Sequence, residues 1–145
     1  MPDVDENDWQ VIESIDQTRY TITYPWHFVS VITRDYARLY LKAEGSWSCL
    51  GSAIEPCGAN GHATLALTVD RLLLPTCAPG ALIGKLGGSI AGRDDGVVFA
   101  ISSRCFVTLP KKEETALYIG VNGATPSESH ELARIKLEVL ASSAT

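Results

Sequence analysis

The stretch LYIGVNGATPSESHELARIKLEV, residues 117–139, decides which class of fold this sequence specifies. It contains an apolar segment, the dipeptide Asn122-Gly123, a run of small, polar and acidic residues, and a second apolar segment. In both apolar segments the hydrophobic side chains stand two residues apart, at Leu117, Ile119 and Val121 and again at Ile135, Leu137 and Val139. Successive side chains of a β-strand point to opposite faces, so this spacing predicts two strands joined by a loop.

Residues 127–140 also fit a helix, with Ser127 as its N-cap. The face that such a helix would bury consists of Leu132, Ile135, Val139 and Leu140. We favour the strand, because charged residues alternate with apolar ones over 134–138 and the rest of the chain shows no long helical pattern. A strand is therefore expected at 133–140.

The remaining strand signals have the same period of two and are rich in Val, Ile, Thr, Tyr and Phe. They lie at 17–23, 27–33, 37–44, 64–69, 80–86, 96–101, 104–109 and 116–121, with a further short strand open at 9–15. Short strands at close spacing predict an all-β protein, an antiparallel, jelly-roll-like β-sandwich. No repeat or linker interrupts the pattern, so we expect one domain over 1–145, with a disordered acidic N-terminus at 1–8.

The composition narrows the class of protein. With 46% hydrophobic and 20% charged residues, the 145-residue chain is typical of a globular protein. Its net charge of −5 argues against a nucleic-acid partner, which requires a basic surface. No apolar run reaches the ~18–20 residues of a membrane span. The acidic N-terminus lacks the basic start of a signal peptide, so we expect a cytoplasmic protein, or one released by a route without such a signal.

The chain has four cysteines, Cys49, Cys57, Cys77 and Cys105. In a cytoplasmic protein they are expected to be reduced, with Cys77 and Cys105 as buried, unreactive thiols. A Cys49–Cys57 disulfide remains open for an oxidising compartment. A zinc site built from Cys49, Cys57, His62 and Cys77 is also conceivable, but its spacings lack the close pair of structural zinc sites.

Little in the sequence indicates catalysis. His27, His62 and His130 are the only histidines, and His27 lies in a strand pattern typical of a half-buried structural histidine. No nucleophile elbow, paired-histidine zinc motif or phosphate loop is present. The run at 84–88, Gly-Lys-Leu-Gly-Gly, resembles a phosphate loop but lacks its Gly-Lys-Ser/Thr end, so we interpret it as a strand end and turn. We expect a protein that is not an enzyme.

The loop after Asn122-Gly123 is rich in oxygen-bearing side chains, a composition that suits calcium, which prefers six to eight oxygen ligands. These side chains are Thr125, Ser127, Glu128, Ser129, His130 and Glu131. An ordinary solvated loop has the same composition, and residue types alone favour that interpretation.

Three segments in the second half of the chain are similar to those of a known family. PGALIGKLGGSI (79–90), VVFAISSRCFVTLP (97–110) and ETALYIGVNG (114–123) resemble consecutive strands of the LecA-like (PA-I type) galactophilic bacterial lectins. YARLYLKAEGSWS (36–48) resembles an earlier strand of that family. The resemblance implies a jelly-roll sandwich that holds calcium at one end, where the ion bridges the protein to two hydroxyls of galactose.

The resemblance also implies site residues. The calcium positions fall on the Leu50 carbonyl, Gly123, Ser127, His130 and Glu131, and the sugar contacts on His62, Asn122, Ser127, His130 and Glu131. Gly123 replaces a carboxylate and His130 is a poor ligand for a hard cation, so calcium binding is expected to be weak or lost unless Glu128 or Glu131 compensates.

The sequence therefore predicts a lectin-like protein that binds a galactose-type glycan. An aromatic platform for the sugar is open to Trp47 or His62, although Trp47 is favoured as a core residue. The alternative is a non-enzymatic module for assembly whose sugar site has decayed. A homo-oligomer is expected in either case, because single sugar sites are weak and several together gain avidity.

Overall fold

The structure is a computed structural model, and it describes residues 9–21, 26–47, 58–61, 72–89, 92, 95–109, 113–123 and 132–143. These residues form eight β-strands and contain no helix, so none of them belongs to a helix able to cross a membrane. The strands are β1 (Gln10–Thr21), β2 (His27–Ile32), β3 (Arg38–Ser46), β4 (Leu82–Leu86), β5 (Val97–Ala100), β6 (Arg104–Thr108), β7 (Thr115–Val121) and β8 (Leu132–Ser142).

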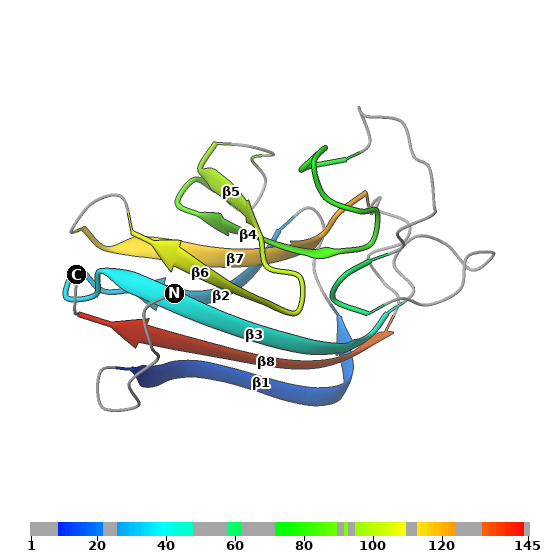
Figure 1. Cartoon of the computed structure of the whole chain (residues 1–145), viewed down its shortest axis with the longest axis horizontal. Coiled ribbons are helices and arrows are strands. Elements are labelled where there is room, and N and C mark those ends of the chain that lie inside the picture. The colour runs from blue at the N-terminus through cyan, green and yellow to red at the C-terminus, as the bar shows by residue number, and fades with distance from the viewer. Residues whose placement is uncertain are drawn as a thin grey trace.

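The strands form two four-stranded antiparallel sheets that pack as a β-sandwich (Figure 1). Sheet A has the order β1-β8-β3-β6, and sheet B has the order β2-β7-β4-β5. Among the strands that the structure describes, only β4 and β5 are consecutive and pair with each other, and the other successive strands alternate between the two sheets. The all-β sandwich predicted from the sequence is confirmed.

Strand β8 resolves the helix-or-strand choice over 127–140 in favour of the strand. It pairs with β1 on one side and β3 on the other. Ile135, Leu137 and Val139 are buried while Arg134 and Lys136 are exposed, which is the period of two expected for a strand with one face in a core. The helical stripe is absent because a central strand gains hydrogen bonds along both edges.

The two separate strands considered at 9–15 and 17–23 are wrong, because β1 is one continuous strand. Its register against β8 shifts between Val11 and Glu13 and between Gln17 and Tyr20. These irregularities interrupt the alternation of side chains, which is why the sequence pattern predicted a break. The predicted strand 64–69 and the acidic segment 1–8 lie outside the described residues.

The main core lies between the two sheets. It is built from alternate residues of the central strands, including Leu39, Leu41, Leu82, Leu117, Ile119, Ile135, Leu137 and Val139, each fully or almost fully buried. Burial of each such side chain contributes about 1.5–3 kcal/mol. Trp47 belongs to this core at 1% exposure, so its interpretation as a core residue is confirmed.

Candidate functional site

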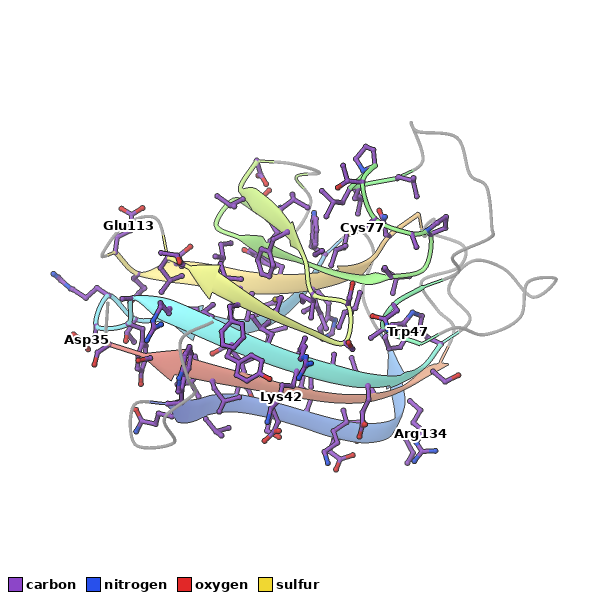
Figure 2. All side chains as sticks on the ribbon, viewed as in Figure 1. Asp35, Lys42, Trp47, Cys77, Glu113 and Arg134 are labelled. Atoms are coloured by element: carbon purple, nitrogen blue, oxygen red, sulfur yellow. The ribbon has the colours of Figure 1, made fainter. Side chains whose placement is uncertain are left out.

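The end of the sandwich where β7 terminates is the place at which the sequence predicted a ligand loop. The structure describes two of the predicted site residues, Asn122 and Gly123, directly after β7. The other predicted positions lie outside the described residues, namely Leu50, His62, Ser127, His130 and Glu131. Figure 2 shows Trp47, Cys77 and Arg134 toward this end of the molecule, and Asp35 and Glu113 at the other.

Asn122 is fully buried, and its side chain contacts the backbone of the segment 72–80. Its Oδ1 accepts a hydrogen bond from the Leu74 amide at 3.0 Å. Its Nδ2 donates to the carbonyls of Leu74, Cys77 and Ala78 at 2.9, 3.1 and 3.3 Å. Both polar atoms of this side chain therefore form hydrogen bonds within the protein, which gives Asn122 a structural role; its predicted sugar contact stays a prediction.

Backbone hydrogen bonds join the same segments further. The Gly80 amide donates to the Asn122 carbonyl at 2.7 Å, and the Asn122 amide donates to the Ala81 carbonyl at 3.0 Å. The Trp47 indole Nε1 donates to the Gly80 carbonyl at 2.8 Å. Residues that follow β3, precede β4 and follow β7 are thus held together at one end of the sandwich, and we call these contacts the end frame.

Gly123 has a φ of +86°, a left-handed conformation that glycine adopts without strain. It offers no side-chain oxygen to a ligand or cation. The backbone turn after β7 explains the glycine at this position, because a residue with a Cβ would adopt this left-handed conformation only with steric strain.

A groove on the outer face of sheet A is a site that the sequence reasoning missed. It has a volume of about 520 Å³ and runs along β3 between β6 and β8. Its lining consists of Tyr40, Lys42, Ala43, Glu44, Ser103, Arg104, Lys136 and Glu138. A second hollow of about 350 Å³ shares Glu44 and Lys136 with it and continues to Arg134.

Aromatic rings stand at the Tyr40 end of this groove. The rings of Tyr40 and Phe106 are stacked at a centroid distance of 4.2 Å, and Trp9 meets both rings edge-on at 6.0 and 5.9 Å. Tyr40 and Phe106 are directly opposite in the β3–β6 register, which places their side chains on the same face. The alternation over 37–44 could have shown that Tyr40, Lys42 and Glu44 share a face, but not which strands flank them.

The outer face of sheet B carries a buried lysine. Lys85 has no solvent exposure, and its Nζ donates to the carbonyls of Ser89 and Gly92 at 2.5 and 2.6 Å and to Asp95 Oδ1 at 2.7 Å. The rings of Trp26 and Tyr118 each have their centroid 5.2 Å from the ammonium. The ammonium is therefore occupied within the protein, which confirms the run 84–88 as a strand end and turn.

Asp95 completes this network. Its Oδ2 accepts hydrogen bonds from the amide and hydroxyl of Ser89 at 2.9 and 2.8 Å. The hydrogen bond from Lys85 is the largest cause that lowers the pKa of the Asp95 carboxyl to about 2, and the Ser89 hydroxyl adds to the effect. A Cβ at Gly88 would collide with this carboxylate, so the turn requires glycine there.

The described histidine and cysteines are structural in character. His27 is half-buried, as predicted, and burial lowers its pKa. Cys77 and Cys105 are free thiols that are partly buried rather than fully buried, and burial raises the pKa of both, for Cys105 to about 12. A thiol that stays protonated is a poor nucleophile. Cys49 and Cys57, and with them the disulfide, lie outside the described residues.

The residues that the structure describes contain no group of three or more His, Cys, Asp or Glu side chains able to hold a metal ion. Of the residues considered for zinc, only Cys77 is among them.

Comparison with known proteins adds no assignment: no family model matches the chain, and no curated protein is significantly similar to it.

Proposed function

We propose that this chain is a non-enzymatic, lectin-like protein that binds a galactose-type glycan at the sandwich end beyond Val121, with its calcium dependence weakened or lost. The end frame is the observation that carries the proposal. It fixes three chain segments to one another at the end where the resemblance to the galactophilic lectins places the sugar. The order of the strands supports the jelly-roll-like arrangement that the resemblance implies.

The residue identities at this end favour weak calcium binding. Gly123 contributes no side-chain oxygen, and the affinity of calcium sites depends on the number of charged ligands. We assign direct sugar contacts to Ser127, His130 and Glu131 and a further contact to His62, whereas the Asn122 side chain bonds to the backbone of Leu74.

Calorimetry with galactose and lactose, in calcium and in chelator, tests this proposal. We expect a dissociation constant in the high-micromolar to millimolar range, about −4 to −6 kcal/mol, that chelator leaves unchanged and Glu131→Ala abolishes. A signal that disappears in chelator would contradict the loss of calcium dependence. Absence of binding to any glycan, in either condition, would leave the chain without lectin activity.

Gly123→Asp tests the calcium position. Any side chain at a φ of +86° carries backbone strain of about 1–2 kcal/mol, so Gly123→Asn is the matched control with the same strain and no added charge. Calcium affinity should rise in Gly123→Asp and not in Gly123→Asn. Equal calcium affinity in both variants would show that the position carried over from the lectins is wrong.

A module for self-assembly is the second candidate function, and the composition of β2 favours it. This strand lies at an edge of sheet B and contains no Asp, Glu, Lys or Arg. Phe28 and Val31 on it are 47% and 45% exposed. Edge strands without charges are prone to pair with another chain. If the protein is a homo-oligomer that forms through β2, light scattering should show dissociation in Val31→Lys and no change in the control Val11→Lys.

A further inference from the structure

The groove along β3, on the outer face of sheet A, has a chemistry that the proposed sugar site at the sandwich end does not use. Three strands contribute to it: β3 carries Lys42 and Glu44, the β6 side carries Ser103 and Arg104, and β8 carries Lys136 and Glu138. Its volume of about 520 Å³ falls within the range of roughly 300–1,000 Å³ that is usual for small-molecule sites.

The charged groups in the groove are only partly used by the protein itself. Lys42 Nζ and Glu138 Oε1 are 3.5 Å apart, with side-chain exposures of 46% and 36%. Among the described residues, no partner within hydrogen-bond or ion-pair distance is found for the side chains of Glu44, Arg104 and Lys136. Glu44 and Lys136 are directly opposite in the β3–β8 register without forming an ion pair, so both remain available to a ligand.

The aromatic end of the groove is built from rings that pack against one another. Tyr40 stacks on Phe106, and Trp9 packs edge-on against both rings. The Arg38 guanidinium lies 5.2 Å from the Trp9 ring centroid. This cation–π contact helps to keep the indole against Tyr40 and Phe106. Phe106 is 43% exposed although it belongs to this cluster, so apolar aromatic surface is presented beside the charged groups.

We propose that this groove binds a neutral oligosaccharide, with one sugar ring against the Tyr40–Phe106 end and the hydroxyls of the rings that follow along β3 on Arg104, Glu44 and Lys136. A sugar ring has an apolar C–H surface that packs on aromatic carbon and hydroxyls that both donate and accept hydrogen bonds. A cation such as Arg104 accepts no hydrogen bond and a carboxylate such as Glu44 donates none, so a hydroxyl-rich ligand satisfies both kinds of group.

The arrangement disfavours other ligands. An anionic ligand placed on Arg104 and Lys136 meets the carboxylates of Glu44 and Glu138 within the same groove. An apolar segment of protein would cover the unpaired charges without hydrogen-bonding to them, which is costly. The second hollow shares Glu44 and Lys136 with the groove and extends toward Arg134, so more than one sugar ring can be accommodated along β3.

The proposal goes beyond the site at the sandwich end and does not depend on it. To test it, the isotope-labelled full chain is titrated with lactose, maltose and cellobiose at millimolar concentration in the presence of chelator, and amide shifts are followed by NMR. At least one of these neutral disaccharides should shift the amides of Lys42, Glu44, Arg104 and Lys136. Raising the salt concentration should not weaken the binding, because the ligand carries no charge.

Variants locate the site. The double variant Glu44→Ala with Arg104→Ala should raise the dissociation constant at least about tenfold, because two charge-assisted hydrogen bonds are lost. The matched control is Arg34→Ala with Glu114→Ala, which removes the same residue types from exposed positions outside the groove and should leave binding unchanged. Thermal unfolding of both double variants confirms that they are folded.

The outcomes separate this proposal from the one above. Disaccharide shifts confined to the loop 124–131, lost in Glu131→Ala and retained in the groove variant, would overturn the groove and leave the sandwich-end site standing. Groove shifts retained in Glu131→Ala would support the groove alone. The proposal is also overturned if none of the three disaccharides shifts the groove amides, or if 3′-sialyllactose binds in a salt-dependent manner and lactose does not.

Discussion

Two lysines on the outer faces of the two sheets show how differently these faces are built. Lys42 on β3 is 46% exposed by side chain and lies 3.5 Å from Glu138. Lys85 on β4 is fully buried and makes three hydrogen bonds of 2.5–2.7 Å. Both lysines occupy alternating positions in strands of similar pattern, LYLKAE and LIGKLG.

The difference comes from what covers each face. On sheet B, Leu73 and Leu74 pack against Trp26, Ile83 and Tyr118. Ser89, Gly92 and Asp95 accept hydrogen bonds from the ammonium. On sheet A, Lys42 lies in a groove open to solvent, between the Tyr40 ring and the carboxylate of Glu138. An outward-facing lysine is therefore exposed or buried according to whether segments distant in the sequence cover its face of the sheet.

Replacing Lys85 should give the largest effect. Lys85→Met keeps most of the side-chain volume but leaves the carbonyls of Ser89 and Gly92 without their donor, and it should lower the free energy of unfolding by about 3 kcal/mol. The matched control Lys42→Met should change it by less than about 0.5 kcal/mol. Chemical denaturation measures both, and equal losses in the two variants would refute the contrast between the faces.

Replacing Asn122 should give the next largest loss of stability, because its side chain holds the segment that covers sheet B. Asn122→Ala removes the partner of the Leu74 amide and of three carbonyls, and should cost about 2 kcal/mol. Hydrogen exchange should accelerate in residues 72–80. The control is Asn60→Ala, which removes one hydrogen bond, from the Ser103 amide at 3.1 Å, and should cost less. Unchanged exchange in 72–80 would contradict this role.

Acid should weaken the Lys85 network in a defined pH window. The pKa of Asp95 is lowered from 3.8 to about 2 in the folded protein, so the folded state favours the ionised carboxylate. This contribution to stability is fully present above about pH 5, decreases as the pH falls past the ordinary pKa of 3.8, and is lost as the pH falls through about 2. The thermal midpoint of Asp95→Asn should depend less on pH than that of wild type over this window. Parallel pH profiles of the two proteins would contradict the assignment.

The smallest effect is expected for the exposed ion pair on sheet A. A double-mutant cycle of Lys42→Ala and Glu138→Ala should give a coupling energy of about 0.5 kcal/mol or less, because solvent and salt screen the charges. The coupling should decrease further at high salt. A coupling above about 1.5 kcal/mol would show that the groove holds this pair much as sheet B holds Lys85 and Asp95.

Much of the candidate chemistry could not be predicted from the sequence. The resemblance to the lectins implies a sugar contact at Asn122, but no local pattern predicts the hydrogen-bond partners of its side chain at 74–78, which lie more than forty residues away. The sequence did not predict the groove along β3, because Arg104 and Lys136 belong to strands that no local pattern places beside β3. Hydrogen-bond partners and neighbouring strands are properties of the fold, and a local pattern does not contain them.

Most of the strands follow from the sequence alone, because alternation with a period of two is a local consequence of strand geometry. The pattern correctly favours a strand over a helix at 133–140, and it favours Trp47 as a core residue, although it divides β1 in two. The burial of Lys85, the exposure of Lys42 and the hydrogen bonds of Asn122 to residues 74–78 follow only from the fold. These outcomes depend on which distant segments cover each sheet, and burial, unlike strand propensity, is set by those non-local contacts.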